Sequence, residues 1–259
     1  MDESTRYREI AADLQHKIES GEWPPGERLP SDAQLCEDYE ASRNTVREAV
    51  RLLVTRGLLD KQGSKGTFVL PKRDPYSTVV NTDTGFGGFE GTVATPRGKM
   101  DFTTPKVEIQ QAPPEIASDL KLDVGAPVVI RHQQRLIKGE LWSMQTSYYP
   151  MRFVTDGATG LLQVEDLTGG TRKYLEGALG VKEVGSYDSM KVRVPNANEA
   201  AAFSIPDDGW VSVFETRQIG VDADGTPIRV TISIYPADRN QFSMKTGTLA
   251  DESPHGGSG

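Results

Sequence analysis

The stretch SRNTVREAVRLLV (Ser42–Val54) is the most informative part of this sequence for the fold. Its apolar residues follow the i, i+3, i+4, i+7 spacing that predicts a helix with one core-facing stripe. That stripe consists of Val46, Ala49, Val50 and Leu53. Three arginines recur every four residues, away from the stripe, and they are Arg43, Arg47 and Arg51. Such a basic face also occurs on ordinary solvated helices, so its meaning depends on the neighbouring segments.

The residues after this helix predict a hairpin. Gly57 ends the helix, and Leu58–Gln62 and Thr67–Leu70 have the composition of two short strands. Between them lies the glycine-rich turn Gly63-Ser64-Lys65-Gly66, which carries a lysine. The basic helix is therefore followed by a hairpin with a cationic tip.

Two further helices are predicted before the basic one. The first has an apolar stripe between Tyr7 and Ile18 and ends at Gly21. The second begins at Ser31, with Gln34 at the spacing of a capping box. Three short helices and a hairpin form a winged helix-turn-helix, whose third helix enters the major groove of DNA while the wing reaches phosphate or the minor groove.

Composition and charge restrict the function. The 259 residues carry a net charge of −8, yet residues 43–73 hold eight Lys or Arg and only two Asp or Glu. The single cysteine, Cys36, excludes an internal disulfide, and three histidines leave little material for a metal site. No nucleophile beside a base is found, so we expect no catalytic residue, metal or cofactor. With no signal peptide or apolar run of ~18 residues, we expect a cytoplasmic protein without membrane contact.

Three segments resemble the GntR family of bacterial transcription regulators. They are Pro24–Ser31, Ser42–Ala49 and Gly63–Val69. The resemblance implies that Arg43 and Arg47 contact operator DNA, that Thr45 bonds a phosphate or a base edge, and that Lys65 and Gly66 form the wing tip. The full set of expected DNA contacts is Ser31, Ser42, Arg43, Asn44, Thr45, Arg47, Arg51, Lys65 and Gly66. The family often has Glu-Arg after the capping serine, where this chain has Asp32-Ala33, so one arginine contact is missing.

The predicted domain boundaries follow from composition. Residues 1–73 form the winged helix-turn-helix domain, and residues 74–102, with the glycine-rich run Gly85–Gly91, have the character of a linker. A phosphate-binding loop is the alternative for that run, but it lacks the G-x-G-x-x-G spacing. Residues 103–250 form a second domain, and residues 251–259 a disordered tail.

The second domain contains one helix-plus-hairpin unit used twice. A helix entered through Pro113-Pro114 precedes a hairpin that ends at Pro150. A helix around Asn198–Phe203 precedes a second hairpin that ends at Pro236. Two such units would pair into one antiparallel sheet, so the predicted fold class is α+β, with a helical head and an antiparallel-sheet domain.

This half is similar to the effector-binding (UTRA) domain of the HutC subfamily, which has a chorismate-lyase-like fold. The matching segments are Gln145–Pro150, Asn198–Ala201, Asp224–Ile228 and Asp238–Phe242. The resemblance implies a ligand pocket against the sheet. Our candidates on the two hairpins are Arg131, Arg135, Gln145, Arg229 and Tyr235. A register slip of one residue would move any of them to the solvent face, so both placements stay open.

A sixth candidate is Thr171, which follows Gly169-Gly170 and is in position to cap a helix. The free N–H groups of that helix would favour an anionic ligand group, although an ordinary cap is an equal alternative. Relatives that bind phosphorylated sugars carry two arginines where this chain has Gln133-Gln134-Arg135, and a glutamate in place of Gln145. These differences argue against an aminosugar phosphate as the effector.

The leading hypothesis is a ligand-responsive transcription regulator, most simply a repressor. It would bind a palindromic double-stranded DNA operator as a homodimer, under the control of a small-molecule effector in the second domain. One alternative makes residues 103–250 an enzyme of chorismate-lyase type that carries a DNA-binding module. Another makes them an interaction domain without a ligand.

Overall fold

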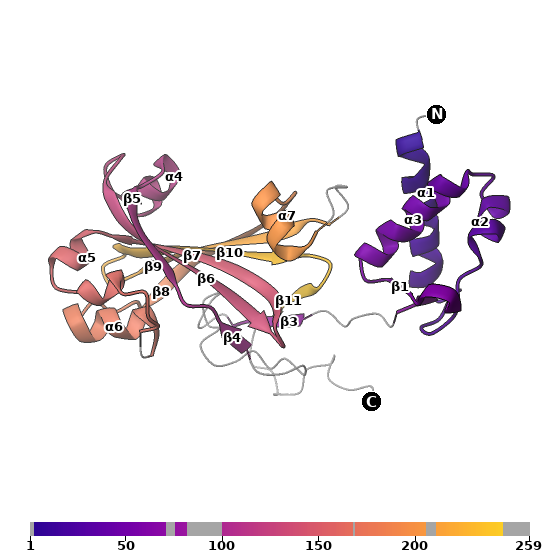
Figure 1. Ribbon diagram of the computed structural model, residues 1–259. Coiled ribbons are helices and arrows are strands. Elements are labelled where there is room, and N and C mark those ends of the chain that lie inside the picture. The colour runs from indigo at the N-terminus through magenta and orange to yellow at the C-terminus, as the bar shows by residue number, and fades with distance from the viewer. Residues whose placement is uncertain (1–2, 71–75, 82–99, 168, 206–210, 246–259) are drawn as a thin grey trace. The chain divides into compact units, whose positions relative to one another are not determined.

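The computed structural model of the chain describes residues 3–70, 76–81, 100–167, 169–205 and 211–245 (Figure 1). The chain divides into two compact units. The first contains Met1–Asp74 and Ser204–Trp210, and the second contains Pro75–Phe203 and Val211–Gly259. The first is mainly helical and the second is built on a large antiparallel sheet, which confirms the predicted fold class.

The first unit has the predicted order of three helices and a hairpin. Its elements are α1 (Glu3–Glu19), α2 (Asp32–Asp38), α3 (Arg43–Thr55), β1 (Leu59–Lys61), the short 3₁₀ turn η1 (Gly63–Lys65) and β2 (Thr67–Val69). The two strands pair antiparallel, with Leu59 opposite Val69. The helices pack around one core, to which α3 contributes its apolar stripe, and Val46 and Leu53 are fully buried there.

Local interactions explain where these helices begin and end. The capping box of α2 is present, because the Ser31 hydroxyl accepts from the Gln34 N–H and the Gln34 side chain accepts from the Ser31 N–H at 2.9 Å. Ser42 caps α3 by accepting a hydrogen bond from the Thr45 N–H at 3.2 Å. Gly57, with a φ of 69°, lets the chain leave α3 in the left-handed conformation.

The second unit contains the remaining elements. They are β3 (Tyr76–Asn81), β4 (Met100–Phe102), β5 (Lys106–Gln111), α4 (Pro114–Asp119), β6 (Pro127–Ile137), β7 (Glu140–Pro150), α5 (Arg152–Thr155), η2 (Thr159–Leu162), α6 (Gly170–Leu179), β8 (Gly185–Arg193), α7 (Ala197–Phe203), β9 (Val213–Val221), β10 (Pro227–Pro236) and β11 (Asn240–Lys245). The main sheet has the order β4-β6-β7-β10-β9-β8, and β5 also pairs with β6.

The predicted duplication is present in the second unit, and each of its two repeats is one strand longer than predicted. The first repeat is β5-α4-β6-β7 and the second repeat is β8-α7-β9-β10. The two hairpins join through β7 and β10, which pair antiparallel with Val230 opposite Tyr148 and Ile234 opposite Met144. The two repeats therefore meet at the centre of the sheet, and we call this junction the seam.

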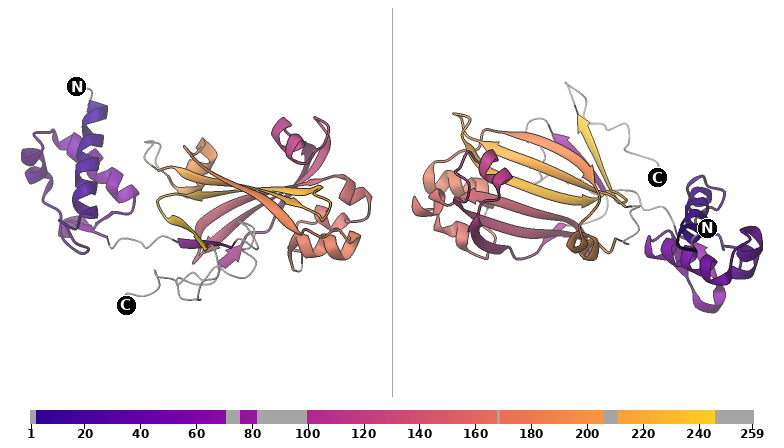
Figure 2. Two further views of the ribbon diagram at one scale, coloured as in Figure 1. Left: turned by 180° about the vertical axis from the view of Figure 1, so that it is seen from behind. Right: turned by 90° about the horizontal axis from the view of Figure 1, so that it is seen from above.

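The helices cover the two faces of the sheet differently. The helices α4 and α7 lie on one face near its two ends, whereas α5, η2 and α6 lie together on the other (Figures 1 and 2). A core on the α4 side contains Ile116, Leu120 and Val128, and a core on the α6 side contains Phe153 and Leu175. The strands place alternate residues into these two layers.

The predicted linker requires a correction. Tyr76–Asn81, inside the segment 74–102, form the strand β3, which pairs in parallel with β11 so that Tyr76 lies opposite Asn240. The run YSTVVN is rich in β-branched and aromatic residues, a composition that suits a strand better than a linker. The glycine-rich run Gly85–Gly91 and the tail 251–259 lie outside the described residues.

Candidate functional site

The basic face of α3 is exposed in the first unit. Arg43, Asn44, Arg47 and Arg51 are all exposed there, opposite the buried stripe. The Arg47 Nε lies 3.3 Å from a carboxylate oxygen of Asp32, and Arg51 donates to Glu48 at 2.6 Å. Exposed ion pairs of this kind contribute only about 0–1 kcal/mol, so these arginines can exchange their carboxylates for phosphates at little cost.

The two serines and Thr45 lie at the helix starts. Ser31 and Ser42 are exposed caps of α2 and α3, whereas the Thr45 side chain is only 6% exposed. The Thr45 hydroxyl lies 2.8 Å from the Ser42 hydroxyl. The Thr45 hydroxyl therefore takes part in the cap of α3, and its contact with a phosphate or a base edge stays a prediction.

The wing tip carries Lys65 and Gly66 as expected. Lys65 is exposed at the end of η1, and Gly66 has a φ of 112°. A Cβ on Gly66 would lie 2.5 Å from the Nε of Arg28, so the arginine packs against the glycine. Residues before α2 also pair with the wing, since the Leu29 N–H donates to the Thr67 carbonyl at 2.8 Å.

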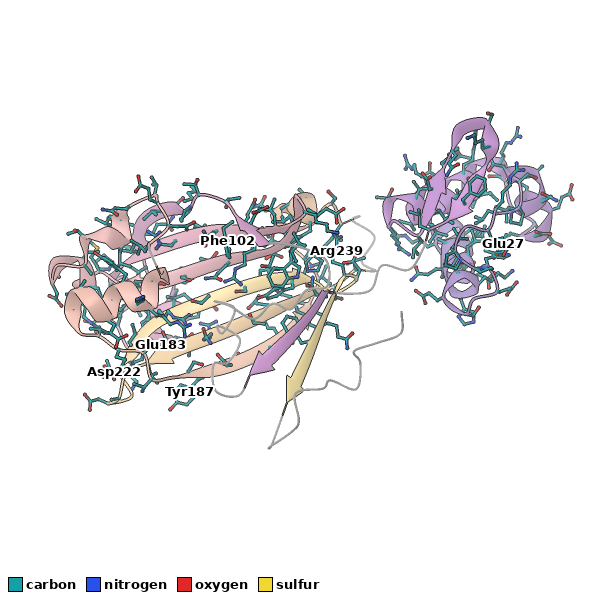
Figure 3. The ribbon with its side chains drawn as sticks, turned by 90° about the horizontal axis from the view of Figure 1, so that it is seen from below. Glu27, Phe102, Glu183, Tyr187, Asp222 and Arg239 are labelled. Atoms are coloured by element: carbon teal, nitrogen blue, oxygen red, sulfur yellow. The ribbon has the colours of Figure 1, made fainter. Side chains whose placement is uncertain are left out.

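Arg28 is a basic residue of this surface that our sequence analysis missed. It is exposed, and its backbone bridges to Phe68 on β2. Figure 3 labels its neighbour Glu27 in this unit. The signal was present, because Arg28 is the one cation in the segment Pro24–Ser31 that carried the family resemblance.

A chain of polar side chains crosses the α6 face of the main sheet. Arg135 on β6 donates to the Gln145 side chain on β7, and Gln145 donates to the Ser147 hydroxyl at 3.2 Å. Ser147 lies 2.9 Å from the Thr231 hydroxyl on β10, to which Arg229 donates at 2.6 Å. The chain thus joins both duplicated hairpins across the seam of the sheet.

The inner end of this chain is a buried ion pair. The Arg229 Nε and Nη2 donate to the two carboxylate oxygens of Glu183, each at 2.7 Å, and Nη2 also donates to Gln218 at 2.5 Å. Both charged side chains are 7% exposed. Burial alone would lower the pKa of Arg229, but the attraction of Glu183 outweighs burial and raises it, so Arg229 stays charged.

Four of the six predicted effector residues surround one polar cavity here. They are Arg135, Gln145, Thr171 and Arg229, and the cavity has a volume of about 70 Å³. Arg172 on α6 also lines it, and its Nη1 lies 3.8 Å from a Glu183 oxygen. Figure 3 views the sheet from the α6 side and labels Glu183. Sequence reasoning missed Glu183, because nothing in its loop marks it as the partner of an arginine 46 residues away.

Arg131 and Tyr235 have other roles than the predicted ones. Arg131 is buried and donates to the carbonyls of Leu161, Gln163 and Glu165 at 2.7–2.9 Å, so it holds the segment after η2 rather than a ligand. Tyr235 is 1% exposed and packs edge-on against Trp142. Burial raises the pKa of Tyr235, against which hydrogen bonds with Ser233 and Arg135 act. Tyr235 is therefore a buried core residue that contacts Arg135.

Thr171 does not cap α6. The N-cap is Gly169, with a φ of 77°, and no side chain makes the capping hydrogen bond. The glycine takes the cap because this left-handed entry disfavours a residue with a Cβ. Thr171 instead lies in the first turn, where its side chain borders the cavity.

A cavity of about 630 Å³ lies on the opposite face of the sheet, and its lining includes His132, Thr146 and Arg193. Among the residues that the structure describes, no group of three or more His, Cys, Asp or Glu is placed to hold a metal ion. None of the described helices combines the length and the apolar character needed to cross a membrane.

Two family models match the chain. Residues 6–69 match the model of bacterial regulatory proteins of the gntR family, and residues 98–241, more than half of the chain, match the UTRA domain. These matches cover the winged helix-turn-helix and the sheet with its polar cavity.

Curated relatives and solved structures agree with the models. The transcriptional regulator YurK of Bacillus subtilis is 29% identical over 249 residues, which cover 93% of this chain and 95% of YurK. The repressor PhnF of Mycolicibacterium smegmatis is 25% identical over 223 residues, 84% of each protein. The crystal structure of PhnF shares the fold, with a TM-score of 0.55 at 22% identity over 93% of this chain and all of that one. This chain belongs to the GntR family of bacterial transcriptional regulators, with a gntR-type DNA-binding domain followed by a UTRA domain.

Proposed function

We propose that this regulator is a repressor that binds a two-fold symmetric operator as a homodimer. In this proposal α3 enters the major groove, where Arg43 and Arg47 contact base edges. Arg51, Lys65 and Arg28 hold phosphates beside it. A homodimer presents two such DNA-binding domains, which we call heads (residues 1–73). Two heads suit a palindromic site in the cytoplasm of a bacterium.

The observation that carries this proposal is the arrangement of α3. Its arginines are exposed on the face opposite the buried stripe, and Arg47 and Arg51 pair with the partly exposed carboxylates of Asp32 and Glu48. Phosphates can replace such partners without leaving a buried charge unpaired. The charges of Arg43, Arg47 and Arg51 are therefore available to DNA.

The second half of the proposal is that a small-molecule effector binds in the polar cavity and changes the affinity for the operator. Support comes from Arg135, Gln145 and Arg229, which converge there from both hairpins. Buried polar groups on a rigid sheet are suited to recognising a polar ligand. Control then requires that the effector have different affinities for two arrangements of the homodimer.

The DNA-binding proposal is tested by selecting genomic fragments that the purified full chain binds and then measuring the affinity for the selected site. Arg47→Ala should weaken binding by about 1–3 kcal/mol, roughly 5- to 150-fold, because one groove contact is lost. Its melting temperature should remain unchanged, since Arg47 is exposed. Lys182→Ala, which removes an exposed cation of the second unit, serves as the matched control. Equal affinities of Arg47→Ala and the unaltered protein would refute the groove assignment.

The effector proposal is tested by titrating a metabolite panel into the protein–operator complex and following fluorescence anisotropy. An effector should change the operator affinity of the unaltered protein. The same compound should have little effect on Gln145→Ala, which keeps the head intact. Light scattering of the free protein tests the homodimer, and a monomer at concentrations that saturate the operator would contradict it.

A further inference from the structure

A carboxylate of the chain itself, that of Glu183, is bound to Arg229, one of the residues that line the cavity we assign to the effector. Both oxygens of this carboxylate accept hydrogen bonds from Arg229 at 2.7 Å, in the two-pronged geometry that arginine makes with free carboxylates. Arg172 on α6 contributes a second cation 3.8 Å away. The two arginines therefore form an anion-binding site, and a carboxylate of the same chain occupies it.

The backbone beneath Glu183 is shaped to admit its carboxylate. A Cβ at Gly220 on β9 would lie 2.4 Å from one Glu183 oxygen, closer than two such atoms can approach. Gly220 does not have a positive φ, so the backbone conformation of the strand does not require a glycine there. The missing side chain makes room for a carboxylate against the sheet.

The two partners are held in different ways. Arg229 lies on the central strand β10 and is fixed by further hydrogen bonds to Thr231 and Gln218. Glu183 lies in the segment 180–184 between α6 and β8, which starts at the left-handed Gly180. Movement of this short segment would remove the carboxylate and leave the arginine in place.

We propose that Glu183 is a built-in occupant of the effector site and that the effector carries a carboxylate that replaces it on Arg229. This inference rests on the proposed function, because it takes the polar cavity as the effector site. A buried arginine without a counter-ion is strongly unfavourable, so the empty protein needs a substitute anion. Exchange of one carboxylate for another keeps Arg229 paired, and it enlarges a cavity that otherwise offers about 70 Å³.

The exchange also links the ligand to the rest of the unit. Once displaced, Glu183 carries with it the segment that joins α6 to β8. The helix α6 supplies Thr171 and Arg172 to the cavity wall, so its position would then depend on which carboxylate occupies Arg229.

Acetate is the probe for this proposal, because it has the atoms that Glu183→Ala removes beyond Cβ. Melting temperatures of the full chain are measured at pH 7 in sodium acetate and in sodium chloride of equal ionic strength. Acetate at several times its Kd should raise the melting temperature of Glu183→Ala by about 2–4 °C over chloride. The unaltered protein should show no such difference, since Glu183 competes intramolecularly.

Three further variants guard against misinterpretation. Glu183→Gln fills the same space, and Glu183→Ala combined with Arg229→Met lacks the guanidinium that binds both carboxylate oxygens, so neither should respond to acetate. Gly220→Ala combined with Glu183→Ala places a methyl group where the carboxylate would lie, so this variant should not respond to acetate either. If Glu183→Ala alone does not fold in chloride, acetate should restore its folding, which circular dichroism measures.

Two results would overturn the proposal. In the first, Glu183→Ala gains neither stability nor folding specifically from acetate. In the second, phosphate stabilises this variant and acetate does not, which would assign the site to phosphate groups instead. Operator binding is a separate measurement, so a chain that binds acetate as expected but selects no DNA would refute the proposed function and leave the anion exchange standing.

Discussion

At the scale of single residues, the wing depends on a backbone conformation that only glycine adopts easily. Gly66 has φ 112° and ψ −165°, outside the left-handed helical region that other residues visit. Gly63, at the other end of the same turn, has a φ of 56°, inside that region. The two glycines therefore tolerate a side chain to different degrees.

Gly66→Ala should consequently destabilise the first unit by about 1–3 kcal/mol and weaken operator binding through a distorted wing. Gly63→Ala, with no atom within 4 Å of its new Cβ, is the matched control and should cost about 1 kcal/mol. Urea unfolding and operator titration of both variants measure the difference. If the two alanines cost the same, the wing does not hold Gly66 in this conformation.

Residue types and spacing predicted part of the candidate site. Side chains alternate between the two faces of a strand, so Arg131 and Arg135 of β6, which are four residues apart, are correctly predicted to share a face. This alternation does not tell which segment covers each end of a strand. The loop after η2 covers Arg131 and the cavity opens beside Arg135, a distinction made by tertiary packing alone.

At the scale of elements, Arg193 connects three parts of the second unit. From β8 it donates to Glu199 on α7 at 2.6 and 2.7 Å and to Glu215 on β9 at 2.6 Å. Burial would raise the pKa of each glutamate, but the hydrogen bonds from Arg193 outweigh burial and lower both pKa values below 4.5. Both carboxylates thus stabilise the fold above that pH, and the contribution is lost as the pH falls through and below about 4.5.

Arg193→Met should therefore cost about 3 kcal/mol at pH 7, because it leaves two largely buried carboxylates without their main cation. The difference in stability between Arg193→Met and the unaltered protein should become smaller as the pH falls from 6 to about 4, because protonation removes the unpaired charges of the two glutamates. Melting temperatures across this range measure it. Lys191→Met removes an exposed cation from the same Glu215 and should cost at most about 1 kcal/mol. A difference that stays constant with pH would contradict this account.

Elements with strong local signals were predictable, and those fixed by distant pairing were not. The capping box at Ser31 and the stripe of α3 both have local causes, and both are present. The pairing of β3 with β11 joins segments more than 150 residues apart, as Tyr76 and Asn240 show. A strand-like composition at Tyr76–Asn81 could be recognised, but its partner could not, because pairing follows from the whole fold.

At the scale of the whole molecule, each unit has a core of its own. Ile10, Leu14 and Leu53 lie in a core built only from the first unit, and the second unit packs its helices on its own sheet. The segment 1–74 is therefore expected to fold without the rest of the chain. This independence allows the contribution of a second head to DNA binding to be measured.

The salt dependence of operator binding should show whether two heads act together. The logarithm of the binding constant falls with the logarithm of salt concentration by about 0.9 for each phosphate neutralised. If a head neutralises about four phosphates through residues such as Arg51 and Lys65, the fragment 1–74 should give a slope of about −4 on a half-site, and the full chain about −7 on the whole operator. Anisotropy titrations between low and physiological salt measure both slopes. Equal slopes would mean that only one head of the full-length protein engages DNA, and the homodimeric, two-fold mode of binding would have to be abandoned.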